Sequence, residues 1–228
     1  MILGLDRLAM HAEDAFLALN PADLAFMFAS GKSEGYLRDV LGAHLSKQFD
    51  HSSFVHVTRE WKKHDLAIMD ERLPLLLIEG KSWISHDAYR KSKLLKDKKS
   101  ILAGALRDAE KLISTAKRYP DVEIYLSTVI YGVDTGEISN PRDFNVAYGD
   151  SHQQGIKSAG SFEDLVSIGR SHASELFQAF GPLRRIPLIA GRYMGMQVEA
   201  DFFLVQIVTP ELISSRFDLA QQISRQIS

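Results

Sequence analysis

The sequence contains no cysteine, no long apolar run and little net charge. The absence of cysteine in 228 residues excludes disulfides, thiolate metal sites and cysteine nucleophiles. No apolar run approaches the roughly 20 residues that span a bilayer, and Asp6 and Arg7 interrupt the N-terminal segment too early for a secretory signal. The net charge of -2 at pH 7 means that only a local basic patch can attract a polyanion. These features predict a cytoplasmic protein that does not associate with membranes.

The composition is that of an ordinary globular protein. Hydrophobic residues make up 45% of the chain and charged residues 25%, which excludes the disordered and fibrous classes. The length allows one large domain or two small ones, and we expect one, over residues 1–228. Within it we expect N-terminal helices in residues 1–50, a core that carries the main motif in about 51–132, and C-terminal helices and a strand in about 160–228.

The most informative stretch is residues 65–81. It holds two apolar segments separated by charged residues and a proline, a pattern that predicts two strands joined by a polar turn. The segments are residues 66–69 and 75–78. Asp65 precedes the first segment, and Glu79-Gly80-Lys81 follows the second. Because side chains alternate along a strand, we expect Glu79 and Lys81 on the same face. Because the start of one strand of an antiparallel pair lies beside the end of the other, we expect both residues close to Asp65.

This arrangement provides ligands for a cation. Charges that directly follow a buried apolar run are costly unless they are paired or bind an ion. Two carboxylates, from Asp65 and Glu79, suit Mg²⁺ or Mn²⁺, which prefer oxygen ligands. Lys81 would then orient or deprotonate a metal-bound water, or stabilise an oxyanion. The alternative is a surface ion pair of Glu79 with Lys81 or Lys63, a common feature that contributes little stability.

Asp65 and Glu79-x-Lys81 after an apolar strand resemble the motif of the PD-(D/E)XK nuclease family, to which many restriction endonucleases and DNA repair nucleases belong. His64 stands where the family has a proline. The family also carries an acidic residue on a helix before the motif, and Glu34 is the candidate here. The resemblance covers a short, degenerate motif in the first half of the chain.

The resemblance implies a restriction endonuclease-like fold and a Mg²⁺-dependent DNA endonuclease, with Mn²⁺ as a substitute ion. Asp65, Glu79 and the backbone carbonyl of Gly80 would ligate the ion, and Lys81 would position the attacking water. Glu34 would hold a second metal or a water of the first; the alternative is that it only complements a helix dipole. A homodimer fits this function, because cutting both strands of DNA needs two sites or a reorientation. The alternative function is a non-catalytic nucleic-acid-binding or assembly module on the same fold.

Apolar periodicity predicts the elements around the motif. Before it, we expect helices over residues 5–29 with a break at 20–23, a helix that Ser33 caps, and a strand over 54–61. After it, we expect a helix over 86–118, a strand over 122–131, a functional or partly disordered loop over 132–160, a helix over 162–180, a strand over 200–208 and a terminal helix from Pro210 to about 227. Two strands, a long helix and a further strand imply a crossover to a parallel neighbour. The fold class is therefore α/β, with a mixed central β-sheet flanked by helices on both faces.

The start of the expected 86–118 helix is basic. Its lysines are expected to contact nucleic-acid phosphates, because they directly follow the proposed metal site. These residues are Lys91, Lys93, Lys96, Lys98 and Lys99. The alternative is that the run is only a solvated helix face.

Two other motif types are excluded. Gly-Lys-Ser occurs at residues 31–33 and 80–82, but a phosphate-binding loop needs a glycine five positions before the Gly-Lys pair, where Phe26 and Leu75 stand. The eight histidines show no zinc spacing, so we expect each to be a surface or half-buried residue and not a ligand.

Overall fold

The computed structural model describes residues 3–31, 33–49, 54–95, 99–136, 138 and 140–207, without the side chains of Lys91, Ser92 and Arg142. Its strands are β1 (Val55–Trp61), β2 (His64–Asp70), β3 (Leu73–Ile84), β4 (Glu123–Val133), β5 (Leu183–Leu188), β6 (Arg192–Tyr193) and β7 (Met196–Gln206). They form a seven-stranded sheet in the order β1-β2-β3-β4-β7-β5, with β6 paired to β7. β3 and β4 are parallel, whereas the other pairs are antiparallel. The predicted mixed sheet is confirmed.

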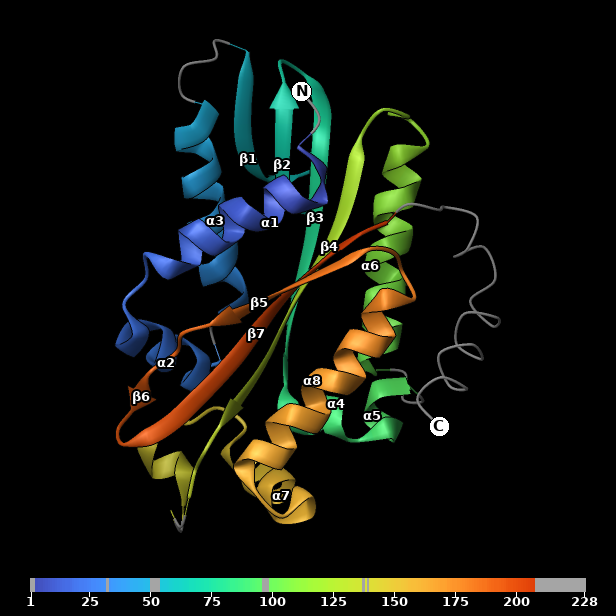
Figure 1. Cartoon of the computed structure of the whole chain (residues 1–228). Helices are drawn as coiled ribbons and strands as arrows, with labels where there is room; N and C mark the ends of the chain where they lie inside the picture. Colours follow the sequence, from blue (N-terminus) through green and yellow to red (C-terminus); the bar gives the residue numbers. More distant parts are fainter. Residues whose placement is uncertain are drawn as a thin grey trace.

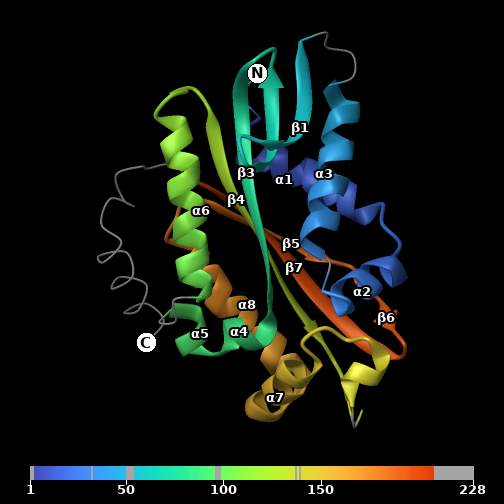
Figure 2. The same ribbon diagram turned by 180° about the vertical axis from the view of Figure 1, so that it is seen from behind.

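Helices lie on both faces of this sheet (Figures 1 and 2). They are α1 (Gly4–Leu17), α2 (Pro21–Ala29), α3 (Ser33–Phe49), α4 (Ser85–Tyr89), α5 (Lys91–Leu95), α6 (Ile101–Ala116), η1 (Pro141–Phe144), α7 (Gly149–Ala159) and α8 (Phe162–Gln178). The helices α1, α2 and α3 pack on one face, and α6 and α8 on the other. None of the helices in the described ranges has the length and apolar character that a bilayer crossing requires.

Each face of the sheet has its own apolar core, because side chains alternate along the strands. On β3, Leu76 and Ile78 belong to the core under α1 and α3, whereas Leu77 belongs to the core under α6 and α8. Phe202 on β7 lies in the first core, and its neighbour Phe203 in the second. The sheet is therefore buried from both sides, as the predicted α/β class requires.

The N-terminal helices follow the sequence pattern closely. The side chain of Asn20 accepts a hydrogen bond of 2.8 Å from the Ala22 N–H, and Pro21 opens α2, as expected. The next helix, α3, begins at Ser33, also as expected. The predicted side-chain cap is wrong, however, because the buried Ser33 hydroxyl has no hydrogen-bond partner in the described part of the chain.

The motif forms the predicted hairpin, with longer strands than expected. β2 ends at Asp70 and β3 begins at Leu73, so the turn contains only Glu71 and Arg72, and Glu71 adopts a positive φ of 50°. Pro74 lies within β3, at the place where the pairing with β2 shifts register. β1 completes the expected three-strand meander.

The crossover after the meander is also confirmed, but the helix in it is not continuous. The predicted helix over 86–118 is wrong: the chain forms α4, α5 and α6 instead. Arg90 has an extended conformation (φ −82°, ψ 106°) that separates α4 from α5. Ser100 then accepts a hydrogen bond of 3.1 Å from the Ala103 N–H and caps α6. The capping serine starts a new helix where periodicity alone predicted a continuous one.

The prediction of a loop over 132–160 is also wrong, since η1 and α7 lie in this stretch. The buried face of α7 carries Gly149, His152 and Gly155 rather than large apolar residues, so it lacks the usual helical signal. At Gly155 a Cβ would lie 2.9 Å from Leu165, which shows how closely α7 approaches α8.

Towards the C-terminus the sequence pattern located some elements and missed others. The strand predicted at 200–208 is β7, which begins four residues earlier, at Met196, and ends at Gln206. The strands β5 and β6 were not predicted. The helix predicted from Pro210 to about 227 lies outside the described residues.

Candidate active site

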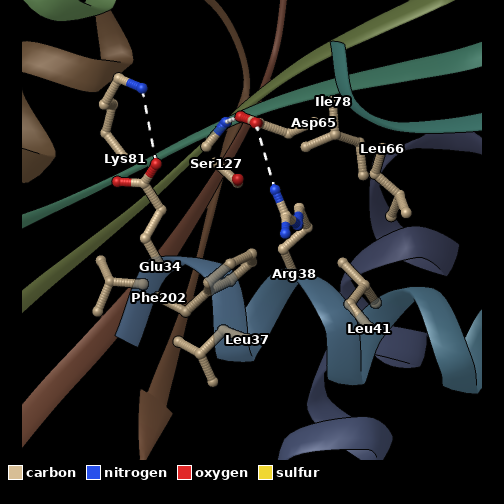
Figure 3. Close-up of a pocket in the computed structure, with 12 residues that line it drawn as sticks. Glu34, Leu37, Arg38, Leu41, Asp65, Leu66, Ile78, Lys81, Ser127 and Phe202 are labelled. Carbon is tan, nitrogen blue, oxygen red and sulfur yellow. Dashed lines mark hydrogen bonds and ion pairs between the residues drawn. The ribbon is translucent and has the colours of Figure 1, made fainter. Parts of the chain in front are cut away.

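A small pocket, partly open to solvent, lies between α3 and the sheet (Figure 3). Its apolar lining comes from Leu37, Leu41, Leu66, Ile78, Val129 and Phe202. Its charged residues are Glu34 and Arg38 from α3, Asp65 from β2 and Lys81 from β3. Three of these four residues were predicted as site residues from the sequence, so the fold brings the motif and the preceding acidic helix together.

Asp65 is fixed by the hairpin register. Leu66 pairs with Ile78, which puts Asp65 beside the start of Glu79-Gly80-Lys81. Its Oδ2 accepts a hydrogen bond of 2.7 Å from the Gly80 N–H. On the other side, its Oδ1 lies 3.8 Å from the Arg38 guanidinium. The predicted proximity of Asp65 to the end of the second apolar segment is confirmed.

Glu34 reaches the same strand from α3. Its Oε2 accepts a hydrogen bond of 3.2 Å from the Ser82 N–H, and its Oε1 lies 3.6 Å from Lys81 Nζ. The amides of Gly80 and Ser82 thus both donate to carboxylates, at the stretch of β3 where the pairing with β2 ends at Ile78 but the pairing with β4 continues to Ile84. Along this edge of β3, the Asp65 and Glu34 carboxylates therefore accept the backbone hydrogen bonds that a neighbouring strand would otherwise accept.

Glu79 points away from the pocket, towards α6. Only 3% of its side chain is exposed, and its Oε1 lies 2.6 Å from His64 Nδ1 and 2.5 Å from Lys111 Nζ. His64 in turn lies 2.8 Å from Thr115 Oγ1. The alternative of a surface ion pair between Glu79 and Lys81 or Lys63 is therefore wrong. His64 is also fully buried, contrary to the expectation for the histidines.

Lys81 lies among four carboxylates. Its Nζ is 3.6 Å from Glu34 and 4.0 Å from Asp108 on α6. Burial by itself would lower the pKa of Lys81, but the charges of Glu34, Asp108, Asp65 and Glu79 outweigh it and raise this pKa. Lys81 is therefore a protonated hydrogen-bond donor at neutral pH. In this arrangement it is not a base that could deprotonate a water.

Asp108 was missed by sequence reasoning. Burial raises its pKa to about 6; the Lys81 charge opposes this shift and the Glu79 charge adds to it. A signal was present in the sequence, because Asp108 follows Ala105 by three residues and precedes Leu112 by four, and both are buried on α6. A carboxylate on the apolar stripe of an amphipathic helix indicates a specific partner or ligand. Lys111, three residues further on, belongs to the same pattern.

The donor set suits a hard divalent cation. Four carboxylates, from Glu34, Asp65, Glu79 and Asp108, lie near the Lys81 ammonium group, and burial keeps the pKa of one of them, Asp108, above its usual value. Oxygen ligands of this kind suit Mg²⁺ and Mn²⁺. These carboxylates are engaged by Lys81, Lys111 and backbone amides, and they do not form a group of three converging ligand atoms. The one such group in the described ranges lies elsewhere, on α1 and α3.

Known proteins provide no guide to this site. No family model, curated protein or solved structure matches this chain. Its chemistry therefore has to be inferred from the charges, hydrogen bonds and burial around Lys81.

Of the predicted phosphate-binding lysines, Lys91 and Lys93 lie on α5, and Lys99 lies just before α6. Lys99 is exposed and Lys93 is half-buried. Lys96, Lys98 and the side chain of Lys91 lie outside the described residues. Contact of this lysine run with nucleic acid stays a prediction.

Proposed function

We propose that this chain is a divalent-metal-dependent nuclease of the PD-(D/E)XK type that hydrolyses DNA phosphodiester bonds. One observation carries the proposal: carboxylates from α3, β2, β3 and α6 lie around a protonated Lys81 beside a solvent-open pocket. Four separate elements contribute charge to one place, although uncompensated buried charge destabilises a fold. Clusters of this kind are typical of functional sites. The restriction endonuclease-like fold is part of the same proposal, and the mixed sheet with helices on both faces is consistent with it.

Asp65, Glu79 and the Gly80 carbonyl would hold Mg²⁺, or Mn²⁺ in its place, and Glu34 would hold a second ion or a water of the first. When bound, the ion would lower the pKa of a water and neutralise charge on the scissile phosphate. The backbone supports this role of Asp65, because the Gly80 N–H fixes its carboxylate at the pocket. To ligate the ion, Glu79 would have to give up its ion pair with Lys111 on α6, so the metal ion and Lys111 would compete for the Glu79 carboxylate.

Lys81 would donate hydrogen bonds to the attacking water and to a phosphate oxygen. About 40% of its side chain is exposed, so it is accessible from the pocket while the surrounding acids keep it protonated. A fixed cation beside a transferring phosphate stabilises charge that develops in the transition state. Arg38, with 26% of its side chain exposed, supplies a second positive group on the same wall.

The polyanionic substrate would be held by local charge, because the whole chain has a net charge of only -2. The lysine run from Lys91 to Lys99 would contact the DNA backbone, and affinity would then fall steeply with salt. A homodimer would place two sites on a duplex for cleavage of both strands.

A second candidate is a non-catalytic nucleic-acid-binding or assembly module. The burial of Glu79 favours it, since this carboxylate already has His64 and Lys111 as partners and needs no ion. The hydrogen bonds of Asp65 and Glu34 to the edge of β3 also have a purely structural use. In this case the pocket would bind phosphate without turnover.

Nicking of supercoiled plasmid and cleavage of single-stranded DNA, in Mg²⁺ and in Mn²⁺, test the proposal. We expect Lys81→Met and Asp65→Asn to lower the rate by at least about 100-fold. Lys157→Met, at an exposed position on α7, is the matched control and should cleave like the wild type. Equal cleavage by all variants would assign the activity to a contaminant, and no cleavage by the wild type would favour the binding module.

A further inference from the structure

Outside the pocket, α1 packs across α3 (Figure 1). Three side chains of the types that can bind a metal ion meet at this contact. His11 and Asp14 are three residues apart on α1, so they share one face of that helix. His44 reaches them from α3. One ligand atom from each of the three side chains lies within 4.8 Å of the other two. The centroids of the two imidazole rings are 5.6 Å apart, with the rings tilted by 54°.

The two imidazoles have unsatisfied nitrogens at this contact. His11 Nδ1 and His44 Nε2 are both buried and have no hydrogen-bond partner within the described residues. Buried polar atoms without a partner are rare in folded proteins, and each one calls for a water, an ion or another explanation.

We propose that His11, Asp14 and His44 form a binding site for a divalent transition-metal ion, with Zn²⁺ as the best match. Two imidazoles and one carboxylate are a frequent zinc donor set, and a water completes the tetrahedron. Asp14 is exposed, so solvent has access to the fourth position. Mg²⁺ prefers an all-oxygen shell and would not select this site.

The bound ion would join α1 to α3, the helix that carries Glu34 and Arg38. This site does not depend on the proposed nuclease function, because none of its ligands lines the pocket. It also replaces the expectation that none of the histidines is a ligand. The spacing gave no signal, since only the packing of α1 on α3 brings His44 to His11.

Calorimetric titration with Zn²⁺ tests the site on the full chain. We expect one high-affinity ion per chain, and at least about a tenfold loss of affinity in both Asp14→Asn and His44→Gln. His56→Gln, at an exposed position on β1, is the matched control and should bind like the wild type. Asp65→Asn should also keep the affinity, which separates this site from the carboxylates of the pocket.

Titration with Co²⁺ adds a readout of geometry, because tetrahedral Co²⁺ absorbs visible light much more strongly than octahedral Co²⁺ does. The wild type should show the strong tetrahedral bands, and Asp14→Asn should lose them. Asp14 is exposed, so this variant reports on the ion without disturbing the core. Equal Zn²⁺ affinity in the wild type, Asp14→Asn and His44→Gln would overturn the proposal, as would a wild type that binds no Zn²⁺.

Discussion

Lys111 on α6 and Glu79 on β3 form an ion pair, with Nζ 2.5 Å from Oε1. Glu79 is almost fully buried, and His64 is its second partner. Lys81, two residues further along β3, contacts Glu34 and Asp108 instead. The strand that carries the motif is thereby tied to the crossover helix.

Replacement of Lys111 by Met should destabilise the fold by about 2–3 kcal/mol, because it leaves the buried Glu79 carboxylate with His64 alone. Urea unfolding measures this change. The double variant Lys111→Met/Glu79→Gln should recover most of the loss, because it also removes the unpaired charge. A double variant that is less stable than Lys111→Met would contradict this description of the pair.

Asp108 should make the stability of the protein depend on pH. Its pKa is raised from 3.8 to about 6 in the folded state, so between about pH 4 and 6 the folded chain retains a proton that the unfolded chain has released. Stability is therefore lost as pH rises through this window, by up to about 3 kcal/mol. Asp108→Asn should be more stable than the wild type at pH 7.5 and nearly equal to it at pH 4.

Thermal unfolding at both pH values measures the difference between the two proteins. Asp121→Asn, at an exposed position after α6, is the control and should show no such dependence on pH. If Asp108→Asn were no more stable than the wild type at pH 7.5, the Asp108 carboxyl would be ionised in the folded protein without a cost in stability.

Gly80 allows Ser127 to approach the strand closely. A Cβ at this position would lie 3.0 Å from Ser127 Oγ and 3.7 Å from Asp65 Oδ2. Gly80→Ala should therefore cost about 1–2 kcal/mol in unfolding free energy. Ser127→Ala in the same chain should restore part of it, since it removes the crowded hydroxyl. If the losses of unfolding free energy from Gly80→Ala and Ser127→Ala were additive, crowding between the new Cβ and the Ser127 hydroxyl would not be the cause of the Gly80→Ala loss.

A buried charge on β7 gives a further prediction. Asp201 is 2% exposed and its Oδ2 lies 2.6 Å from Arg170 Nε, whereas Arg184 pairs with Asp6 at the surface. Arg170→Met should cost about 2–3 kcal/mol and Arg184→Met less than about 1 kcal/mol, as judged by chemical denaturation. Equal costs would mean that burial does not govern these pairs.

The sequence predicted the parts of the fold that depend on local pattern. Apolar alternation located the hairpin, and its antiparallel pairing placed Asp65 near the end of the second apolar segment. The first-turn position of Glu34 and the crossover to a parallel β4 also followed from short-range signals. These features are fixed by residues that are close in sequence or by one strand pairing.

The remaining features depend on how distant elements pack. Lys111 reaches Glu79 only because α6 lies over β3, and no spacing in the sequence specifies that contact. The break at Arg90 and the small buried face of α7 conflict with simple periodicity, so a continuous helix and a loop were predicted instead. Packing likewise decides that His11 meets His44.

Binding of Mn²⁺, followed by the loss of its free paramagnetic resonance signal, tests the central claim most directly. The titration is made in the His44→Gln background, so that the site on α1 and α3 does not contribute. We predict saturable binding that is lost when Asp65→Asn and Glu79→Gln are added together. Binding that survives both changes, or no binding before them, would contradict a metal-dependent site around Lys81.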